Sequence, residues 1–195
     1  MTDHRPADTE NANDRAEPSR RRLPGDLEPE ALLHRMIRVD QAGEYGARRI
    51  YEGQMAVLGA QDPQLRHMAE QERRHLALFD DLMVERRVRP TLLQPFWHVA
   101  GFALGAATAM LGREAAMACT VAVEEVIDEH YRRQGEALGE AEPQLKRIIE
   151  ECRQEEVEHR DIGLAEGAEK APAYPLLTAA IKAGSRLAIW LSERV

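Results

Sequence analysis

Apolar residues recur along most of this chain every three or four positions, which is the spacing of amphipathic helices. Start and stop signals divide this pattern into segments. Asp26 and Asp62 are expected to precede the first two helices, Pro63 suits a first helical position, and Gly139 supplies a stop. The sequence therefore predicts an all-α fold, with helices over Pro29–Gly59, from Pro63 to near Arg89, over Arg113–Leu138, from Pro143 to about Glu169, and from Leu176 to about Ser192.

Residues 90–112 contain no formally charged side chain. Pro90, Pro95 and three glycines interrupt the segment, and its purely apolar part is too short to span a bilayer. We expect a short helix that lies in a membrane interface or is buried against the rest of the protein. Gly101 and Gly105 match a small-residue packing motif, but such a match carries little weight in a run rich in Gly and Ala.

The last helix is expected to be amphipathic, with Lys182 and Arg186 on one face and Trp190 at the boundary. Together with the helix in residues 90–112, it would give two apolar, membrane-facing helices beside a helical bundle. The apolar face opposite the two basic residues is expected to hold Leu177, Ile181, Ala188 and Leu191.

The two halves of the chain share one plan, in which a helix with one key glutamate is followed by a helix with a Glu-x-x-His motif. Residues three, four, seven and eleven positions apart share a face of a helix. By this criterion, each of the key residues interrupts an apolar stripe that should face the core. They are Glu44, Glu72 and His75 in the first half, and Glu124, Glu156 and His159 in the second.

Burying these six side chains without counter-charge would be costly, because an unpaired carboxylate loses its hydration and four carboxylates repel one another. Two divalent cations would cancel the four negative charges, and the imidazoles would complete their coordination. Four carboxylates and two imidazoles delivered by four helices are the ligand set of a di-iron or di-manganese site in a ferritin-like bundle. The sequence therefore predicts a ferritin-like four-helix bundle with a two-metal centre.

Residues near these motifs allow further expectations. Glu52 and Glu125 share their faces with polar or small residues and are expected to be solvated. Glu155 is expected to accept a hydrogen bond from a ligand histidine. Tyr131 lies two turns after Glu124 on the same face, so we expect it to line the site. We assign no function to His34, His67, His98 or His130.

Length and composition bound the remaining possibilities. The 195 residues fit one domain over residues 27–195, preceded by a polar, disordered tail over residues 1–26. The net charge of −8 argues against a nucleic-acid-binding protein. Cys119 and Cys152 are expected to be small core residues. The acidic residues in the tail are unlike a transit peptide, and no signal peptide is apparent, so we expect a bacterial cytoplasmic setting.

Several stretches around the key residues resemble one known family, the demethoxyubiquinone hydroxylases of ubiquinone biosynthesis. The resemblance runs from about Leu32 to the C-terminus, and its motifs recur in the family's order and spacing. The matching stretches are RVDQAGEYGA from Arg38, ACTVAVEE from Ala118, EEVEHRDIGL from Glu155 and LSER from Leu191.

The resemblance implies a ferritin-like enzyme that hydroxylates the demethoxyubiquinol ring, with two iron ions as cofactor and O2 as co-substrate. It also implies a peripheral protein on the cytoplasmic face of the bacterial inner membrane, with the lipid surface and other ubiquinone-biosynthesis proteins as partners. In such a site, Glu44 and His75 would bind one iron, Glu124 and His159 would bind the other, and Glu72 and Glu156 would bridge the two.

Two other readings remain open at this point. A ferritin-like protein of iron oxidation or storage would use the same ligands without an organic substrate, but the uncharged segment and the apolar last helix are unlike a soluble cage. A purely structural lipid-binding bundle would account for the apolar segments but not for the buried carboxylates.

Overall fold

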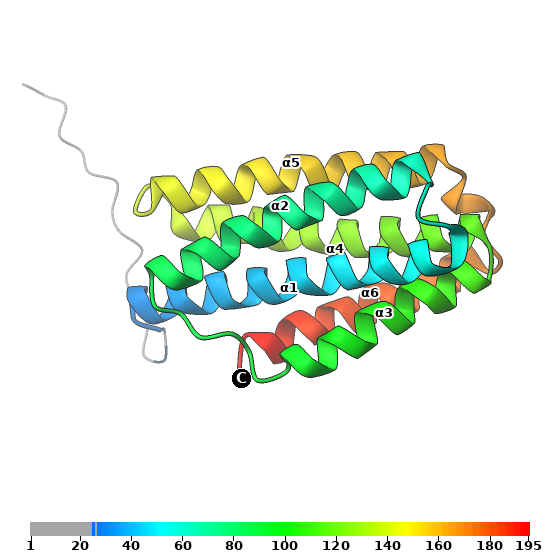
Figure 1. Cartoon of the computed structure of the whole chain (residues 1–195). Coiled ribbons are helices and arrows are strands. Elements are labelled where there is room, and N and C mark those ends of the chain that lie inside the picture. Colours follow the sequence, from blue (N-terminus) through cyan, green and yellow to red (C-terminus); the bar gives the residue numbers. More distant parts are fainter. Residues whose placement is uncertain (1–24, 26) are drawn as a thin grey trace, which may run out of the picture.

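The computed structural model describes residue 25 and residues 27–195. These residues form an all-α fold without strands (Figure 1). The prediction of a tail over residues 1–26 and the expected cap at Asp26 fall outside this range, apart from residue 25. The helices are α1 (Pro29–Leu58), α2 (Pro63–Glu85), α3 (Gln94–Met110), α4 (Arg113–Leu138), α5 (Pro143–Ala165) and α6 (Tyr174–Ser192), with a short 3₁₀ helix at Ala168–Lys170.

Local signals explain most of the helix boundaries. The Asp62 side chain caps α2 by accepting hydrogen bonds from the backbone N–H groups of Gln64 and Leu65, at 3.1 and 3.0 Å. Gly139 follows α4 with a positive φ of 56°. Three predicted ends were wrong: α2 stops at Glu85, α5 stops at Ala165 before the 3₁₀ turn, and α6 begins at Tyr174.

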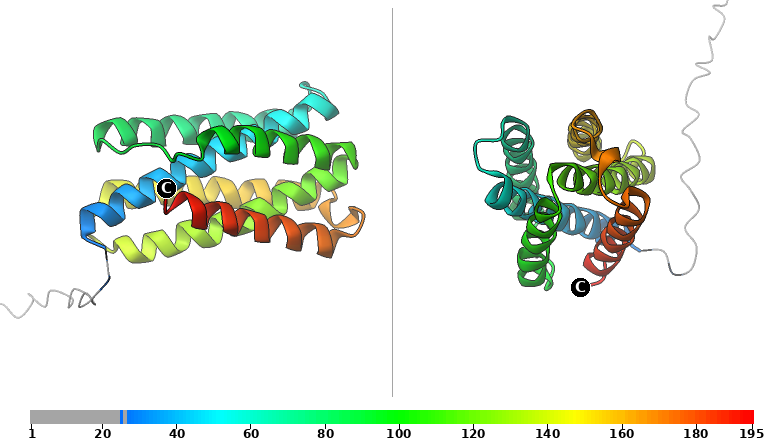
Figure 2. Two further views of the ribbon diagram at one scale, coloured as in Figure 1. Left: turned by 90° about the horizontal axis from the view of Figure 1, so that it is seen from below. Right: turned by 90° about the vertical axis from the view of Figure 1, so that its right-hand side faces the viewer.

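Helices α1, α2, α4 and α5 form a ferritin-like bundle, in which α1 packs on α2 and α4 packs on α5. Helix α3 returns the chain along the bundle, so that α2 and α4 run in the same direction (Figures 1 and 2). Seen from the end, α2 and α5 form one layer, α1 and α4 the next, and α3 and α6 an outer layer (Figure 2). The outer pair therefore covers only α1 and α4.

The apolar core of the bundle is divided into two main parts. One cluster contains Ile37, Phe79, Tyr131 and Ile149, and another contains Tyr51, Leu65, Met68 and Met117. Along each bundle helix, the predicted site residue lies between residues of these two clusters, so the polar centre is enclosed by apolar packing on either side. Cys119 and Cys152 are buried core residues, as predicted.

Helix α3 packs so closely on α1 that glycines are required at the contact. A Cβ atom at Gly101 would lie 2.8 Å from the Gly46 carbonyl oxygen. At Gly105, a Cβ would overlap the Ile50 carbonyl group, and at Gly53 it would overlap Phe102. The low weight given to the glycine pair in the sequence was therefore wrong, because both glycines lie at the helix–helix contact.

Gly105→Ala should destabilise the protein, because the added methyl group forces α3 away from α1. Overpacking of this kind costs about 1–3 kcal/mol, and the melting temperature should fall by a few degrees. Gly135→Ala is the matched control, because a Cβ there meets nothing within 4 Å. This control should leave stability equal or slightly higher. Equal melting of the Gly105 variant and the unaltered protein in calorimetry would contradict the close contact.

Contacts with other helices fix the rotation of helix α6. Ile181 is buried, and Leu177 packs partly against the core. Lys182 and Arg186 form ion pairs with Glu125 and Glu129 of α4. Leu177 and Ile181 of the expected apolar face therefore pack toward the protein, whereas Ala188 and Leu191 line an apolar groove. The exposed apolar residues of α6 include Leu176, Leu187 and Trp190.

Candidate metal centre

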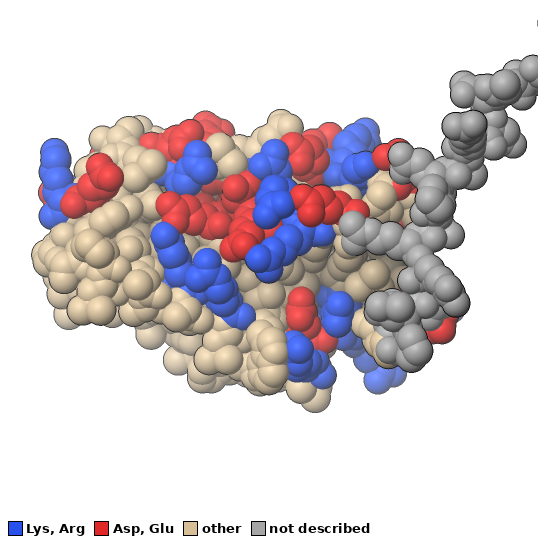
Figure 3. Space-filling view, turned by 180° about the vertical axis from the view of Figure 1, so that it is seen from behind, with Lys and Arg blue, Asp and Glu red and all other residues tan. Residues whose placement is uncertain are grey.

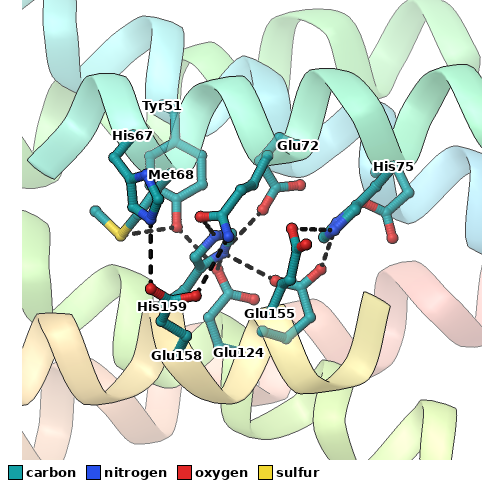
Figure 4. A network of polar contacts seen from close by, with 12 residues as sticks. Tyr51, His67, Met68, Glu72, His75, Glu124, Glu155, Glu158 and His159 are labelled. Carbon is teal, nitrogen blue, oxygen red and sulfur yellow. Dashed lines mark hydrogen bonds and ion pairs between the residues drawn. The ribbon is translucent and has the colours of Figure 1, made fainter. Parts of the chain in front are cut away.

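The structure brings all six predicted residues together between the four helices of the bundle. Figure 4 shows Glu72, His75, Glu124 and His159 among them. Each is at least 97% buried. Their carboxylate and imidazole atoms form two overlapping groups, in each of which the candidate ligand atoms lie within 4.8 Å of one another. Glu72 and Glu156 belong to both groups. The first group is Glu44, Glu72, His75 and Glu156, and the second is Glu72, Glu124, Glu156 and His159.

Both imidazoles direct Nδ1 toward the carboxylates. His75 Nδ1 lies 3.3 Å from Glu44 Oε2 and 3.1 Å from Glu156 Oε1. His159 Nδ1 lies 3.2 Å from Glu72 Oε1 and 3.0 Å from Glu156 Oε2. The opposite ring nitrogens, Nε2, face outward to other partners. Each histidine is therefore oriented to offer Nδ1 to a metal ion.

The donor set fits two divalent cations. Buried polar atoms normally have hydrogen-bond partners, so several unpartnered atoms in one place need an explanation. Among the described residues, both carboxylate oxygens of Glu72 lack hydrogen-bond partners, as do Glu44 Oε2, Glu156 Oε2 and the Nδ1 atoms of His75 and His159. Carboxylate and imidazole ligands of this kind suit iron and manganese.

Electrostatics in the cluster reflect crowding of negative charge. Burial, together with the charges of Glu156 and Glu44, raises the pKa of Glu72 well above its ordinary value. Burial and the charges of Glu156 and Glu72 do the same to the pKa of Glu124. Burial also acts to raise the pKa of Glu156, but His159 and His75, whose Nδ1 atoms lie 3.0 and 3.1 Å from its carboxylate, outweigh burial and lower that pKa. Burial alone would lower the pKa values of His75 and His159. The contact with Glu156 outweighs burial at both residues, and Glu44 adds to this effect at His75, so both pKa values are raised.

Metal removal should leave a protein whose stability rises as pH falls. Glu72 and Glu124 have folded pKa values above the ordinary 4.5, and the two histidines have values above 6.5. The folded state therefore holds more protons than the unfolded state, and stability is lost as pH rises through the folded values.

The melting temperature of the metal-free protein should accordingly increase from about pH 8 down to about pH 5. Below the ordinary glutamate value of 4.5, the lowered pKa of Glu156 reverses the trend. Metal affinity should instead increase as pH rises, because the ligands must release their protons before they bind metal. Calorimetry with and without metal at several pH values tests this, and a metal-free protein that is less stable at pH 5.5 than at pH 8 would contradict it.

Two buried tyrosines contact the outer glutamates. The hydroxyl of Tyr131, the candidate site-lining residue, donates to Glu44 Oε1 of α1. Tyr51 donates to Glu124 Oε1 at 3.1 Å. The sequence reasoning did not single out Tyr51, although its position seven residues after Glu44 on the same face was an available signal.

The outer nitrogens of the histidines have the acceptors that such a site requires. His75 Nε2 lies 3.0 Å from Glu155 Oε2, the residue predicted for this role. His159 Nε2 lies 2.9 Å from Gln71 Oε1, a buried residue that the sequence reasoning missed. Its place beside Glu72, four residues before His75 on the same helix, was an available signal.

Neither Glu52 nor Glu125 belongs to the cluster, as expected. However, both form ion pairs and are not simply solvated: Glu52 pairs with Arg48 at 2.8 Å, and Glu125 pairs with Lys182 of α6.

His130 contacts the buried carboxylate of Asp40 at 3.1 Å, and Gln134 donates to the same oxygen at 2.7 Å. These residues form a separate polar cluster that the sequence reasoning did not identify.

Comparison with known proteins gives a consistent picture. The family model described as "Ubiquinone biosynthesis protein COQ7" matches residues 31–192. The chain is 63% identical over 177 residues to the 3-demethoxyubiquinol 3-hydroxylase of Rhodospirillum rubrum, covering 89% of this chain and 84% of the relative. It is 57% identical over 171 residues to the mitochondrial NADPH-dependent 3-demethoxyubiquinone 3-hydroxylase of Homo sapiens, covering 85% of this chain and 79% of that protein.

Proposed function

The chain belongs to the family of the ubiquinone biosynthesis protein COQ7, and we propose that it is a 3-demethoxyubiquinol 3-hydroxylase that uses O2 at a di-iron centre. The observation that carries the iron assignment is the pair of overlapping, buried ligand groups that share Glu72 and Glu156. We propose Glu44 and His75 as ligands of one iron, Glu124 and His159 as ligands of the other, and Glu72 and Glu156 as bridges.

Bound iron would cycle its oxidation state to pass electrons to O2 and would offer open coordination positions for it. Hydroxylation inserts one oxygen atom of O2 into a C–H bond of the ring. The second oxygen atom departs as water, and its reduction requires two electrons and two protons. The human relative is named as NADPH-dependent. This chain has no G-x-G-x-x-G dinucleotide fingerprint, so we propose that the electrons come from outside it or from the quinol.

The surrounding residues would hold the ligands and exclude water. Tyr131 and Tyr51 hydrogen-bond the carboxylates of Glu44 and Glu124 and so fix their orientation. Glu155 and Gln71 orient the histidine rings. The apolar clusters on either side of the centre keep bulk water from it.

An apolar groove offers a place for the isoprenoid tail of the substrate. It has a volume of about 460 Å³ and lies between α3 and α6. Its floor is formed by α1 and α4, the helices that carry Glu44 and Glu124 on their other sides. Gly43 and Gly46 keep part of this floor free of side chains, and Trp97 of α3 donates a hydrogen bond to Ser192 of α6 at 3.0 Å across one end.

We further propose that α3 and α6 rest on the cytoplasmic face of the inner membrane. None of the helices in the described part of the chain is long and apolar enough to cross a membrane. Figure 3 shows that charged side chains gather over part of the surface, whereas the end where α3 finishes and α6 begins is largely uncharged. Exposed apolar residues occur along both helices and just after α3; they are Phe96, Val99, Met110, Leu111, Leu176, Leu187 and Trp190.

A charge on this surface should weaken membrane binding without affecting the metal centre. Ala103 is exposed on α3, so Ala103→Asp should reduce flotation with phosphatidylethanolamine–phosphatidylglycerol liposomes. The cost is expected to be smaller than at a bilayer centre, about 1–2 kcal/mol, or roughly a tenfold loss of binding. Iron content and activity on a short-tail quinol should remain.

Ala77→Asp on α2 is the matched control, because Ala77 is also exposed but lies in the layer farthest from α3 and α6. It should float like the unaltered protein. Unchanged flotation after aspartate substitution at both Ala103 and Leu187 would rule out this surface as the membrane contact.

The proposed reaction is tested by anaerobic loading with Fe(II), followed by addition of a short-chain demethoxyubiquinol, a reductant and isotope-labelled O2. The proposal expects a product heavier by one labelled oxygen atom. Iron oxidation without hydroxylated product would favour an iron oxidation or storage protein. Failure to take up iron would instead favour a structural bundle.

A further inference from the structure

The two candidate metal positions have matching inner surroundings. Each has one histidine Nδ1 and one outer glutamate, and the two share Glu72 and Glu156. Each outer glutamate also accepts a hydrogen bond from one buried tyrosine. Inner ligands alone therefore give little reason for the two positions to differ in affinity.

The outer partners of the histidines do differ, and Figure 4 shows the one at His75, which is Glu155. His75 Nε2 faces a carboxylate, Glu155, at 3.0 Å. His159 Nε2 faces a neutral amide, Gln71, at 2.9 Å. An imidazole that binds metal through Nδ1 carries its proton on Nε2, so both residues act as acceptors.

The carboxylate on the His159 side is one hydrogen bond farther away. The Gln71 amide nitrogen donates to Glu158 Oε2 at 3.3 Å, which directs the amide oxygen of Gln71 toward His159. Glu158 also contacts His67 at 3.4 Å (Figure 4). On the His75 side, Glu155 contacts the ring directly, and Arg74 binds the same carboxylate oxygen at 3.0 Å.

A charged acceptor strengthens a histidine ligand more than a neutral one does, because it draws the Nε2 proton and raises the electron density at Nδ1. Arg74 and the 35% exposure of the Glu155 side chain reduce this effect but leave a full carboxylate in direct contact with the ring. The amide of Gln71 is buried and carries no charge.

We propose that these outer partners make the two metal positions unequal: the position at His75 binds its ion more tightly and fills first, and the position at His159 binds more weakly. Glu155 and Gln71 are thus positioning residues that set the order of loading. This inference rests on the proposed two-metal centre.

Anaerobic titration of the metal-free full-length protein with Co(II), followed by its absorption bands and by calorimetry, tests the proposal. We expect two binding steps whose dissociation constants differ by about tenfold or more, within the range known for outer-shell partners. In crystals loaded with one equivalent of Co(II), anomalous scattering should place the ion at His75.

Glu155→Gln replaces the charged acceptor by an amide of the same size. This change should weaken Co(II) binding at the His75 position, so that the two dissociation constants become similar, while binding at the His159 position stays unchanged. Glu151→Gln is the matched control, because Glu151 is exposed on the same helix, and it should preserve both steps.

The possible failures are distinguishable. Two equal steps in the unaltered protein, first occupancy at His159, or an unchanged affinity ratio in Glu155→Gln would overturn the inequality and leave the two-metal centre standing. No Co(II) binding at the cluster would overturn both the inequality and the metal centre.

Discussion

Glu72→Gln should abolish iron binding and, at the same time, stabilise the metal-free protein. Glu72 is fully buried, and neither of its oxygens has a hydrogen-bond partner. Burial and the charges of Glu156 and Glu44 raise its pKa well above the ordinary value, so the ionised form opposes folding when metal is absent. Glutamine keeps the size of the side chain, removes the charge and can donate to the neighbouring carboxylates.

The expected gain for the metal-free variant is about 1–2 kcal/mol, which raises the melting temperature by a few degrees at neutral pH. Iron content should fall close to background in the same preparation. Glu70→Gln is the control, since Glu70 is exposed on the same helix and pairs with Arg73. Retention of two irons, or a lower melting temperature of the metal-free variant, would contradict the assignment of Glu72 as a bridge that is stabilised by metal.

Glu156→Ala should also abolish iron binding and hydroxylation, but it should destabilise the metal-free protein. Glu156 is the partner of both histidines, at 3.1 Å from His75 and 3.0 Å from His159. These contacts lower its pKa in spite of burial, so its charge stabilises the metal-free cluster. Removing one partner of a buried ionic group costs about 3–5 kcal/mol.

Activity of this variant should fall by more than the roughly 10–100-fold loss that is typical for outer-shell partners. Metal analysis, calorimetry and the hydroxylation assay together test the prediction. Glu151→Ala, an exposed position on the same helix, should change none of these three readouts. Normal iron content in Glu156→Ala would remove Glu156 from the ligand set. A metal-free variant as stable as the unaltered protein would refute its stabilising role.

The sequence predicted the bundle and the six clustered residues for one physical reason. Helical periodicity identifies which residues share a face, and a carboxylate such as Glu44 or Glu124 within an apolar stripe is too costly to bury without a partner. The spacing of Glu72 from His75 adds a second ligand on the same face. These arguments require no knowledge of how the helices pack.

Features that depend on packing were harder to predict. The rotation of α6 could not be predicted from its own sequence, because ion pairs between Lys182 and Glu125 and burial of Ile181 fix it, and both involve other helices. Gln71 was missed because a lone glutamine on a helix does not reveal a partner 88 positions away. Gly105 was undervalued because only the close approach of α3 to α1 shows the need for glycine.

We expect the four-helix core to hold two iron ions, and crystals loaded anaerobically with Fe(II) can show them. Anomalous difference maps recorded on both sides of the iron absorption edge should contain two buried peaks. One should lie among Glu44, Glu72, His75 and Glu156, and the other among Glu72, Glu124, Glu156 and His159. A core without iron peaks, or iron found only on the protein surface, would contradict the account.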